Sequence, residues 1–383
     1  MLSKIYGKYP QIFIYTFFLY MPSALTVVYI PLLLKNAGLD VKLTGFLMSV
    51  PFILTLLFQT FWGRLADKSK FKNKIVLIAM LFCAVIIPAI GFRKNFWWLL
   101  LVIILYNFFY LPIIPVSDAL SVELGTNHGI RYGNIRVMGT LGFMLISFLS
   151  GYMADMGLNI VFIVTALIHA LTFFLFLPID KIEGKDHKKN SFRLFNFIFH
   201  TPQLLSLYFI TIFLNMAISI QGAFFSIYFI EELNFSTKLL GLQAMLRPVL
   251  EIPYLLFANK IANKVPAKPV LFLSVILTGL RMLIMGLADN LIIIILTCFL
   301  LGSTYMVVHY YLVTVAAELV PPEGRASVQS FSTAVCNVPR IVGSAGGGFL
   351  VATLGYGNVS VIAGILMFIT AIIFLFLPIK YKK

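Results

Sequence analysis

Long apolar runs recur along the chain, and short segments that hold most of the charged residues separate them. A helix needs about 20 mostly apolar residues to cross the hydrocarbon core of a bilayer, and it satisfies its own backbone hydrogen bonds there. Twelve runs reach about this length, so we predict twelve transmembrane helices. The first six are Pro10–Leu34, Leu43–Gly63, Ile75–Phe92, Asn95–Ser117, Val137–Ala154 and Met156–Ile179. The second six are Thr201–Ile230, Leu239–Asn259, Pro269–Ala288, Asn290–Ala317, Ala326–Val351 and Leu354–Ile379.

A polar segment, residues 180–200, divides these runs into two groups of six. An internal repeat supports two related halves, because a shift of 196 residues aligns Leu43–Lys68 with Leu239–Lys264. We therefore predict an all-α polytopic fold with 12 transmembrane helices in two pseudo-symmetric six-helix bundles, residues 1–179 and 201–383, joined by a cytoplasmic linker. Paired halves of this kind place a solute site between them near the middle of the membrane.

The composition agrees with a bilayer as the solvent, because 60% of the residues are hydrophobic, 11% are charged and the mean hydropathy is +0.98. The net charge of +15 is unevenly distributed, since 21 of the 29 Lys and Arg residues fall on one side of the predicted membrane. The positive-inside rule places that side and both termini in the cytoplasm, which predicts a multi-pass protein of a bacterial-type inner (plasma) membrane. No segment could build the folded basic face that nucleic acid requires.

The second predicted span ends in a glycine followed by charged residues, Gly63-Arg64-Leu-Ala-Asp67-Lys68. Gly63 would let two helices cross closely, and Asp67 could accept hydrogen bonds from a helix N-terminus or an arginine. The stretch resembles the signature loop G-x-x-x-D-R/K-x-G-R/K-R/K of the major facilitator superfamily, although Lys70 stands at the second glycine position. The resemblance implies that these residues form a gating loop. The alternative is an ordinary basic loop that obeys the topology rule.

A second polar group lies at the end of the fourth predicted span and the start of the fifth. Asp118 and the sequence Tyr132-Gly-Asn-Ile-Arg136 resemble the branch that contains phenylpropionate permeases, nucleoside symporters and lactose-permease-like oligosaccharide symporters. In the lactose-permease-like members a carboxylate pairs with the helix-five arginine, and an aromatic residue stacks on the substrate. The resemblance gives these substrate-binding roles to Asp118, Arg136 and Phe143. Alternatively, Asp118 caps a helix end and Arg136 lies among lipid headgroups.

Rare charges also occur inside the spans of the second half. Arg247, a further substrate-binding candidate, and Glu251 lie one helical turn apart and share a face, and a buried carboxylate beside an arginine can carry a proton. Arg281 and His309 match an arginine and a histidine of the phenylpropionate-permease branch, which adds both to the predicted proton-coupling group. Glu251 could instead form a structural salt bridge, and His309 could be an interior hydrogen-bonding residue. Further polar candidates for a cavity are Asn107, Asn215, Gln221, Gln243 and Asn337.

The motifs of rival protein classes are missing from the sequence. It contains no H-E-x-x-H, no G-x-S-x-G and no P-loop, so we predict neither an enzyme nor an ATP-driven pump, and no cofactor or metal. The predicted function is a secondary active transporter, acting as a monomer in the lipid bilayer, that takes up a small polar solute with protons. The solute could be an oligosaccharide, a nucleoside or an aromatic or other organic anion. Proton-antiport efflux of sugars or drugs is the alternative.

Overall fold

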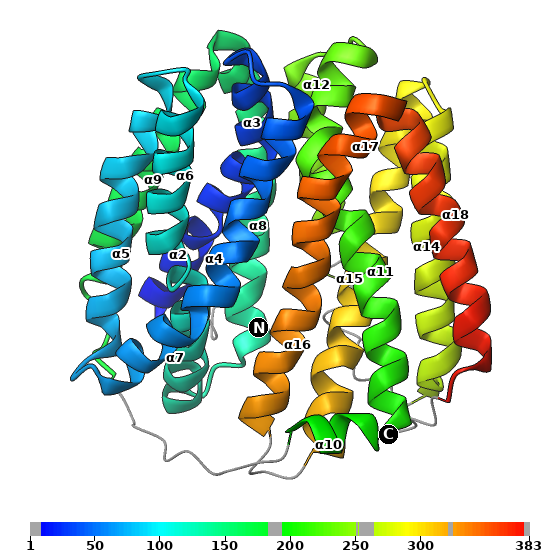
Figure 1. Ribbon diagram of the computed structural model, residues 1–383. Coiled ribbons are helices and arrows are strands. Elements are labelled where there is room, and N and C mark those ends of the chain that lie inside the picture. The colour runs from blue at the N-terminus through cyan, green and yellow to red at the C-terminus, as the bar shows by residue number, and fades with distance from the viewer. Residues whose placement is uncertain (1–8, 183–193, 250–251, 253–263, 321–324, 379–383) are drawn as a thin grey trace. The chain divides into compact units, whose positions relative to one another are not determined.

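The computed structural model describes residues 9–182, 194–249, 252, 264–320 and 325–378, and every regular element in these ranges is a helix (Figure 1). The first half holds α2 (Pro10–Leu19), α3 (Met21–Asn36), α4 (Val41–Lys68), α5 (Lys72–Ile86), η1 (Ile87–Gly91), α6 (Phe96–Tyr110), α7 (Ile113–His128), α8 (Tyr132–Met156) and α9 (Leu158–Phe176). The second half holds α10 (Leu194–Phe199), α11 (Pro202–Ile227), η2 (Tyr228–Glu232), α12 (Thr237–Leu246), η3 (Arg247–Val249), α14 (Ala267–Leu287), α15 (Leu291–Leu319), α16 (Arg325–Ile341), η5 (Val342–Gly346), α17 (Gly347–Leu354) and α18 (Tyr356–Phe376).

Ten helical segments in the described ranges are long and apolar enough to cross a membrane, and each coincides with a predicted span. Of the two other predicted spans, the tenth is covered by the continuous helix α15. The eighth begins with α12 and η3, and most of its remaining residues lie outside the described ranges. The all-helical, multi-pass prediction is therefore confirmed, whereas the count of twelve stays a prediction.

Two helices continue well beyond their predicted ends. The fourth predicted span stops at Ser117, but the helical segment that starts at Phe96 continues to His128. Similarly, α4 continues through Lys68, five residues past the predicted end at Gly63. Polar residues ended the apolar runs without ending the helices, because a helix makes its backbone hydrogen bonds within itself in lipid and in water alike.

The chain divides into two compact units. Unit 1 comprises Met1–Asp40, Ile53–His187 and Phe229–Met245. Unit 2 comprises Val41–Phe52, Lys188–Tyr228 and Leu246–Lys383. The start of α4 thus groups with unit 2, and a segment that follows α11 groups with unit 1. The sequence-based boundaries at residues 179 and 201 remain a prediction.

Glycines on α8 allow close helix packing in unit 1. α8 packs against α2 and α3, and α9 packs against α3 and α5. A Cβ atom added at Gly142 would lie 1.8 Å from the carbonyl oxygen of Phe17, and one added at Gly139 would lie 2.3 Å from the ring of Tyr20. Any larger residue at these positions would therefore separate α2 from α8, and the small residues hold Tyr20 against α8.

Close glycine contacts also organise unit 2. α14 packs along α18, and the two helices run side by side in Figure 1. A Cβ at Gly286 would lie 2.4 Å from the carbonyl oxygen of Gly357. α11 packs against α16 and η5, where a Cβ at Gly343 would lie 2.1 Å from the Ser219 hydroxyl oxygen. Large apolar side chains such as Leu57, Val85 and Phe174 remain exposed on the helices of the molecule, as expected for surfaces that face lipid.

Candidate functional site

Tyr20 contacts both charged residues of the predicted substrate group in unit 1. Its hydroxyl donates a hydrogen bond of 2.5 Å to Oδ1 of Asp118 on α7. The guanidinium carbon of Arg136, on α8, lies 3.9 Å from the centre of the Tyr20 ring. Arg136 also donates from Nη1 to the Thr140 hydroxyl over 3.4 Å. The tyrosine therefore binds the carboxylate through its hydroxyl and the cation through its ring face.

The local sequence explains how Tyr20 reaches these groups. Tyr20 lies between α2 and α3, and the missing side chain of Gly139 leaves room for its ring against α8. Tyr132, the first residue of α8, hydrogen-bonds the same carboxylate. One residue earlier on α7, the hydroxyls of Ser117 and Tyr15 lie 2.5 Å apart and join α7 to α2. Asp118 is thus held in a cluster of aromatic hydroxyl groups.

The structure brings Asp118 and Arg136 into one cluster without a direct ion pair between them. The structure does not contain the predicted direct contact between the carboxylate and the guanidinium. Instead, the Tyr20 ring covers one face of Arg136, and the Tyr20 hydroxyl binds Oδ1 of Asp118. Phe143 lies two helical turns after Arg136 on α8 and is half-buried. The substrate-binding roles of these residues stay predictions.

Arg281 is the central charged residue of unit 2. It lies on α14 and is 1% exposed. Its Nε donates to the carbonyl oxygen of Thr297 over 3.0 Å, and its Nη1 donates to Oε1 of Gln221 on α11. Its Nη2 has no hydrogen-bond partner in the part of the chain that the structure describes. The described hydrogen-bond partners of this buried positive charge are thus neutral, an arrangement that leaves much of its desolvation cost uncompensated.

Two pairs of charged or titratable side chains lie in unit 2, and Arg281 belongs to the first of them. Arg247, in η3, is half-buried and close enough to Arg281 for the two positive charges to interact. Arg340, on α16, donates from Nε to Oδ1 of Asn215 over 2.8 Å. His309, on α15, is exposed and lies close enough to Arg340 for an electrostatic interaction between the two side chains. Arg247 thus lies near Arg281, and His309 lies near Arg340.

Glu251, the predicted proton carrier, lies outside the described residues. Its predicted contacts with Arg247 and Arg281 are therefore untested. The arrangement of those two arginines leaves the prediction open, since Arg281 retains a nitrogen without a described partner.

The predicted gating residues Gly63, Arg64, Asp67 and Lys68 lie within the last turns of α4 rather than in a loop. The helix continues through them because basic side chains near a helix C-terminus interact favourably with its dipole. A Cβ added at Gly63 would meet no atom of the described residues within 4 Å, and the predicted close helix crossing at this glycine stays a prediction. Arg64 and Lys68 are exposed, and a gating role for the four residues stays a prediction.

Sequence reasoning missed Tyr20, although a signal for it was present. A tyrosine inside an otherwise apolar span needs a partner for its hydroxyl, which marks it as a candidate for a polar cluster. Gln221 and Asn215 were among the polar candidates, and the structure shows each bound to an arginine. No group of three His, Cys, Asp or Glu side chains within the described ranges is arranged to hold a metal ion. The two clusters instead offer hydroxyl, amide and guanidinium groups, which suit reversible hydrogen bonding to a small polar molecule.

The chain is similar in sequence to a family of known proteins. The family described as "MFS_1 like family" matches residues 9–372. The "Probable 3-phenylpropionic acid transporter" of Escherichia coli (strain K12) is 25% identical over 291 residues, which cover 72% of this chain and 70% of that protein. The "Multidrug resistance protein MdtG" of Proteus mirabilis (strain HI4320) is 22% identical over 327 residues, which cover 82% of this chain and 80% of that protein.

The fold has a similar counterpart among solved structures. The crystal structure of the nucleoside transporter NupG superposes with a TM-score of 0.81 at 16% sequence identity, over 96% of this chain and 98% of that one. The Escherichia coli protein and the solved structure are named as transporters, and none of the three is named as an enzyme. The chain belongs to the MFS_1-like family of the major facilitator superfamily and is a multi-pass membrane transporter.

Proposed function

We propose that this chain is a proton-coupled symporter that takes up a small organic anion by alternating access. The observation that carries the proposal is the environment of Arg281, whose described partners are the neutral Gln221 and the Thr297 carbonyl. Its Nη2 lacks a described partner. A carboxylate would be a stronger partner than an amide, because it adds an opposite charge in a low-dielectric environment.

The charge balance inside the predicted spans also supports an anion. Three arginines, Arg247, Arg281 and Arg340, stand against one carboxylate, Glu251, in these segments. Bound anionic solute would reduce this excess, whereas a neutral solute would leave it unchanged. Arg136 and Asp118 lie just outside the predicted spans and are opposite in charge, so they do not change this excess.

Competition for arginine would couple the solute to a proton. In this scheme ionised Glu251 pairs with Arg281 or Arg247. Protonation of Glu251 breaks that pair and frees the arginine for the carboxylate of the solute. Solute and proton then bind together, and the empty carrier returns with Glu251 ionised and paired. His309, which lies near the charge of Arg340, is the second candidate proton site.

The unit 1 cluster offers a second set of groups suited to a solute. Asp118 and Tyr20 supply hydrogen-bonding groups, and Arg136 lies against the Tyr20 ring. Phe143, on the same helix as Arg136, offers a half-buried aromatic side chain for stacking. Within unit 1, a solute that has both a ring and a polar group would suit these side chains. The name of the Escherichia coli relative, a 3-phenylpropionic acid transporter, describes a solute of this class.

The proposal includes a topology. Both termini lie in the cytoplasm, two six-helix halves are joined by residues 180–200, and the transporter acts as a monomer. The excess of Lys and Arg in the segments assigned to the cytoplasm supports this orientation.

Efflux by proton antiport is the second candidate function. Its support is the similarity to MdtG, which is named as a multidrug resistance protein and aligns with 82% of this chain. An exporter could use the same clusters, because the contacts of Arg281 and Tyr20 do not set the direction of transport.

Uptake by proteoliposomes tests the proposal. Vesicles with an acidic exterior would be offered labelled 3-phenylpropionate, uridine or maltose. We expect accumulation of the aromatic carboxylate, and we expect Arg281→Gln to abolish it. Lys264→Gln removes one exposed positive charge outside the described spans and should transport normally. Accumulation of uridine or maltose without the carboxylate would contradict the anion assignment, and extrusion of the carboxylate under the same gradient would favour antiport.

A further inference from the structure

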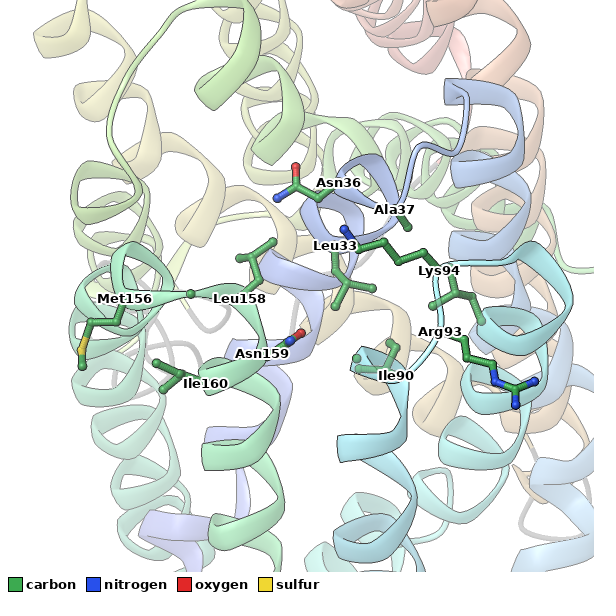
Figure 2. Close-up of a pocket in the computed structure, with 13 residues that line it drawn as sticks. Leu33, Asn36, Ala37, Ile90, Arg93, Lys94, Met156, Leu158, Asn159 and Ile160 are labelled. Atoms are coloured by element: carbon green, nitrogen blue, oxygen red, sulfur yellow. The ribbon is translucent and has the colours of Figure 1, made fainter.

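A pocket of about 350 Å³ opens at one end of unit 1 (Figure 2). It lies where three helix connections meet, namely the end of α3, the segment between η1 and α6, and the turn between α8 and α9. Its lining contains none of the residues assigned above to solute or proton binding. The pocket therefore needs an explanation separate from the transport clusters.

Two positive charges and no negative charge line this pocket. Arg93 and Lys94 lie in its wall with the amides of Asn36 and Asn159, and its lining includes neither Asp nor Glu. In Figure 2, Lys94 extends toward the side that Leu33 and Asn36 form, whereas Arg93 points the other way. The two side chains thus diverge from their shared segment, with Lys94 directed toward the end of α3, and both add positive potential to the pocket.

The contacts of Arg93 leave its charge available. Its guanidinium carbon lies 5.6 Å from the centre of the Trp98 ring, a contact that orients the cation without neutralising it. Leu158 and Asn159, which begin α9, also line the pocket, and no side chain caps this helix start. The positive end of the helix dipole therefore adds to the field of the two basic side chains.

Arg93 and Lys94 are assigned to the side of the membrane that holds few basic residues. In the proposed orientation only five of the 29 Lys and Arg residues lie on the outer side. Two of the other three are ion-paired, since Lys35 is 3.6 Å from Glu231 and Lys238 is 2.9 Å from Asp155. Arg93 and Lys94 are instead adjacent in sequence and share a pocket without carboxylates. A bound anion accounts for this local concentration of positive charge.

Apolar side chains around the pocket identify the kind of anion. Leu33, Ile90 and Leu158 contribute apolar walls. Phe92 and Trp97, which flank the two cations in sequence, are each 75% exposed. Aromatic side chains beside basic residues at a helix end are typical of the depth at which lipid headgroups lie. The ligand therefore combines a negative group with apolar chains.

We infer that this pocket binds the phosphate of an anionic phospholipid of the phosphatidylglycerol type, with the phosphate near Lys94 and within the field of Arg93. The apolar walls then contact the upper part of the acyl chains. Assignment to the outer leaflet rests on the proposed topology, but lipid binding itself does not. A basic side chain near an anionic lipid surface contributes about five-fold in affinity, so removal of both should weaken binding by about 25-fold.

Native mass spectrometry of the purified full-length chain tests this inference. Phosphatidylglycerol would be titrated against wild type, Arg93→Gln/Lys94→Gln and Lys42→Gln, the last removing an outer basic residue that does not line the pocket. We expect the double variant to bind about 25-fold more weakly and the control to bind as wild type does. The exchange Arg93→Lys/Lys94→Arg keeps both charges and should retain binding, which separates loss of charge from misfolding.

Two results would overturn the inference. Unchanged binding by the double variant would show that the lipid binds elsewhere. Displacement of bound phosphatidylglycerol by millimolar glycerol phosphate would show a site for soluble anions in place of one for lipid, whereas no displacement supports the lipid assignment. The measurement involves no transport, so its failure would leave the proposed symport unaffected.

Discussion

Replacement of Tyr20 with phenylalanine tests the unit 1 cluster, because it removes one hydroxyl and keeps the ring. The lost interaction is the 2.5 Å hydrogen bond to Asp118. A hydrogen bond to a charged group contributes about 1.5–3 kcal/mol to stability, and loss of one donor to a partly buried carboxylate should cost a similar amount. Tyr132 also hydrogen-bonds this carboxylate, so we expect a value near the lower end of that range.

Tyr29→Phe provides the matched control. The Tyr29 hydroxyl lies 2.9 Å from the Ser150 hydroxyl, so this substitution removes a buried hydrogen bond between two neutral groups. A bond of that kind contributes about 0.5–1.5 kcal/mol. Equilibrium unfolding in mixed micelles would give the free energy of unfolding for wild type and both variants. If Tyr20→Phe lost no more stability than Tyr29→Phe, the charged character assigned to the Tyr20–Asp118 bond would be wrong.

The ring of Tyr20 can be tested separately with Arg136. Tyr20→Leu removes the hydroxyl and the ring, so it should cost about 0.5–2 kcal/mol more than Tyr20→Phe through the lost cation–π contact. In an Arg136→Gln background that additional loss should shrink by the same amount. An additional loss of equal size in both backgrounds would exclude the cation–π contact as its cause.

Two further predictions concern packing and the start of the segment that follows α9. Gly142→Ala should lower the stability by about 1–3 kcal/mol and impair transport, because the new Cβ would lie 1.8 Å from the Phe17 carbonyl oxygen. Gly133→Ala, on the same helix with no atom within 4 Å, should be neutral, and equal effects of the two substitutions in thermal unfolding would refute the packing argument. Asn73→Ala should speed hydrogen exchange at the Ile182 amide, which donates to Asn73 Oδ1 over 3.0 Å. Unaltered exchange there would show that this bond does not restrain the segment.

The helices could be predicted from the sequence because a helix that crosses the bilayer must contain a long run of apolar residues. Each of the ten helical segments able to span a membrane coincides with a predicted run, although their ends differ. The ends differ because the length of an apolar run reflects the thickness of the hydrocarbon core. The helix itself can continue into polar surroundings, since its backbone hydrogen bonds are made within the helix. Asp118 shows the difference, since it lies beyond the predicted end of its span at Ser117 and still inside α7.

The partners of the buried charges could be predicted only in part. Asp118 and Arg136 were placed in one cluster by their motif, but the position of Tyr20 between them depends on the close packing of α2 and α8 at Gly139. Gly63 shows a further limit, because a glycine in a motif does not reveal whether a second helix approaches it. Contacts between helices depend on rotation and depth, and neither is encoded in the spacing of apolar residues.

The central claim is that a proton and an organic anion bind together, and the most direct test compares two transport modes in Glu251→Gln. The measurement is uptake of labelled 3-phenylpropionate by proteoliposomes, first against a concentration gradient under an imposed pH gradient and then as counterflow at uniform pH. Wild type should perform both modes. Glu251→Gln, which cannot release a proton at this position, should keep counterflow and lose uphill accumulation. A Glu251→Gln variant that still concentrated the anion against its gradient would contradict the account.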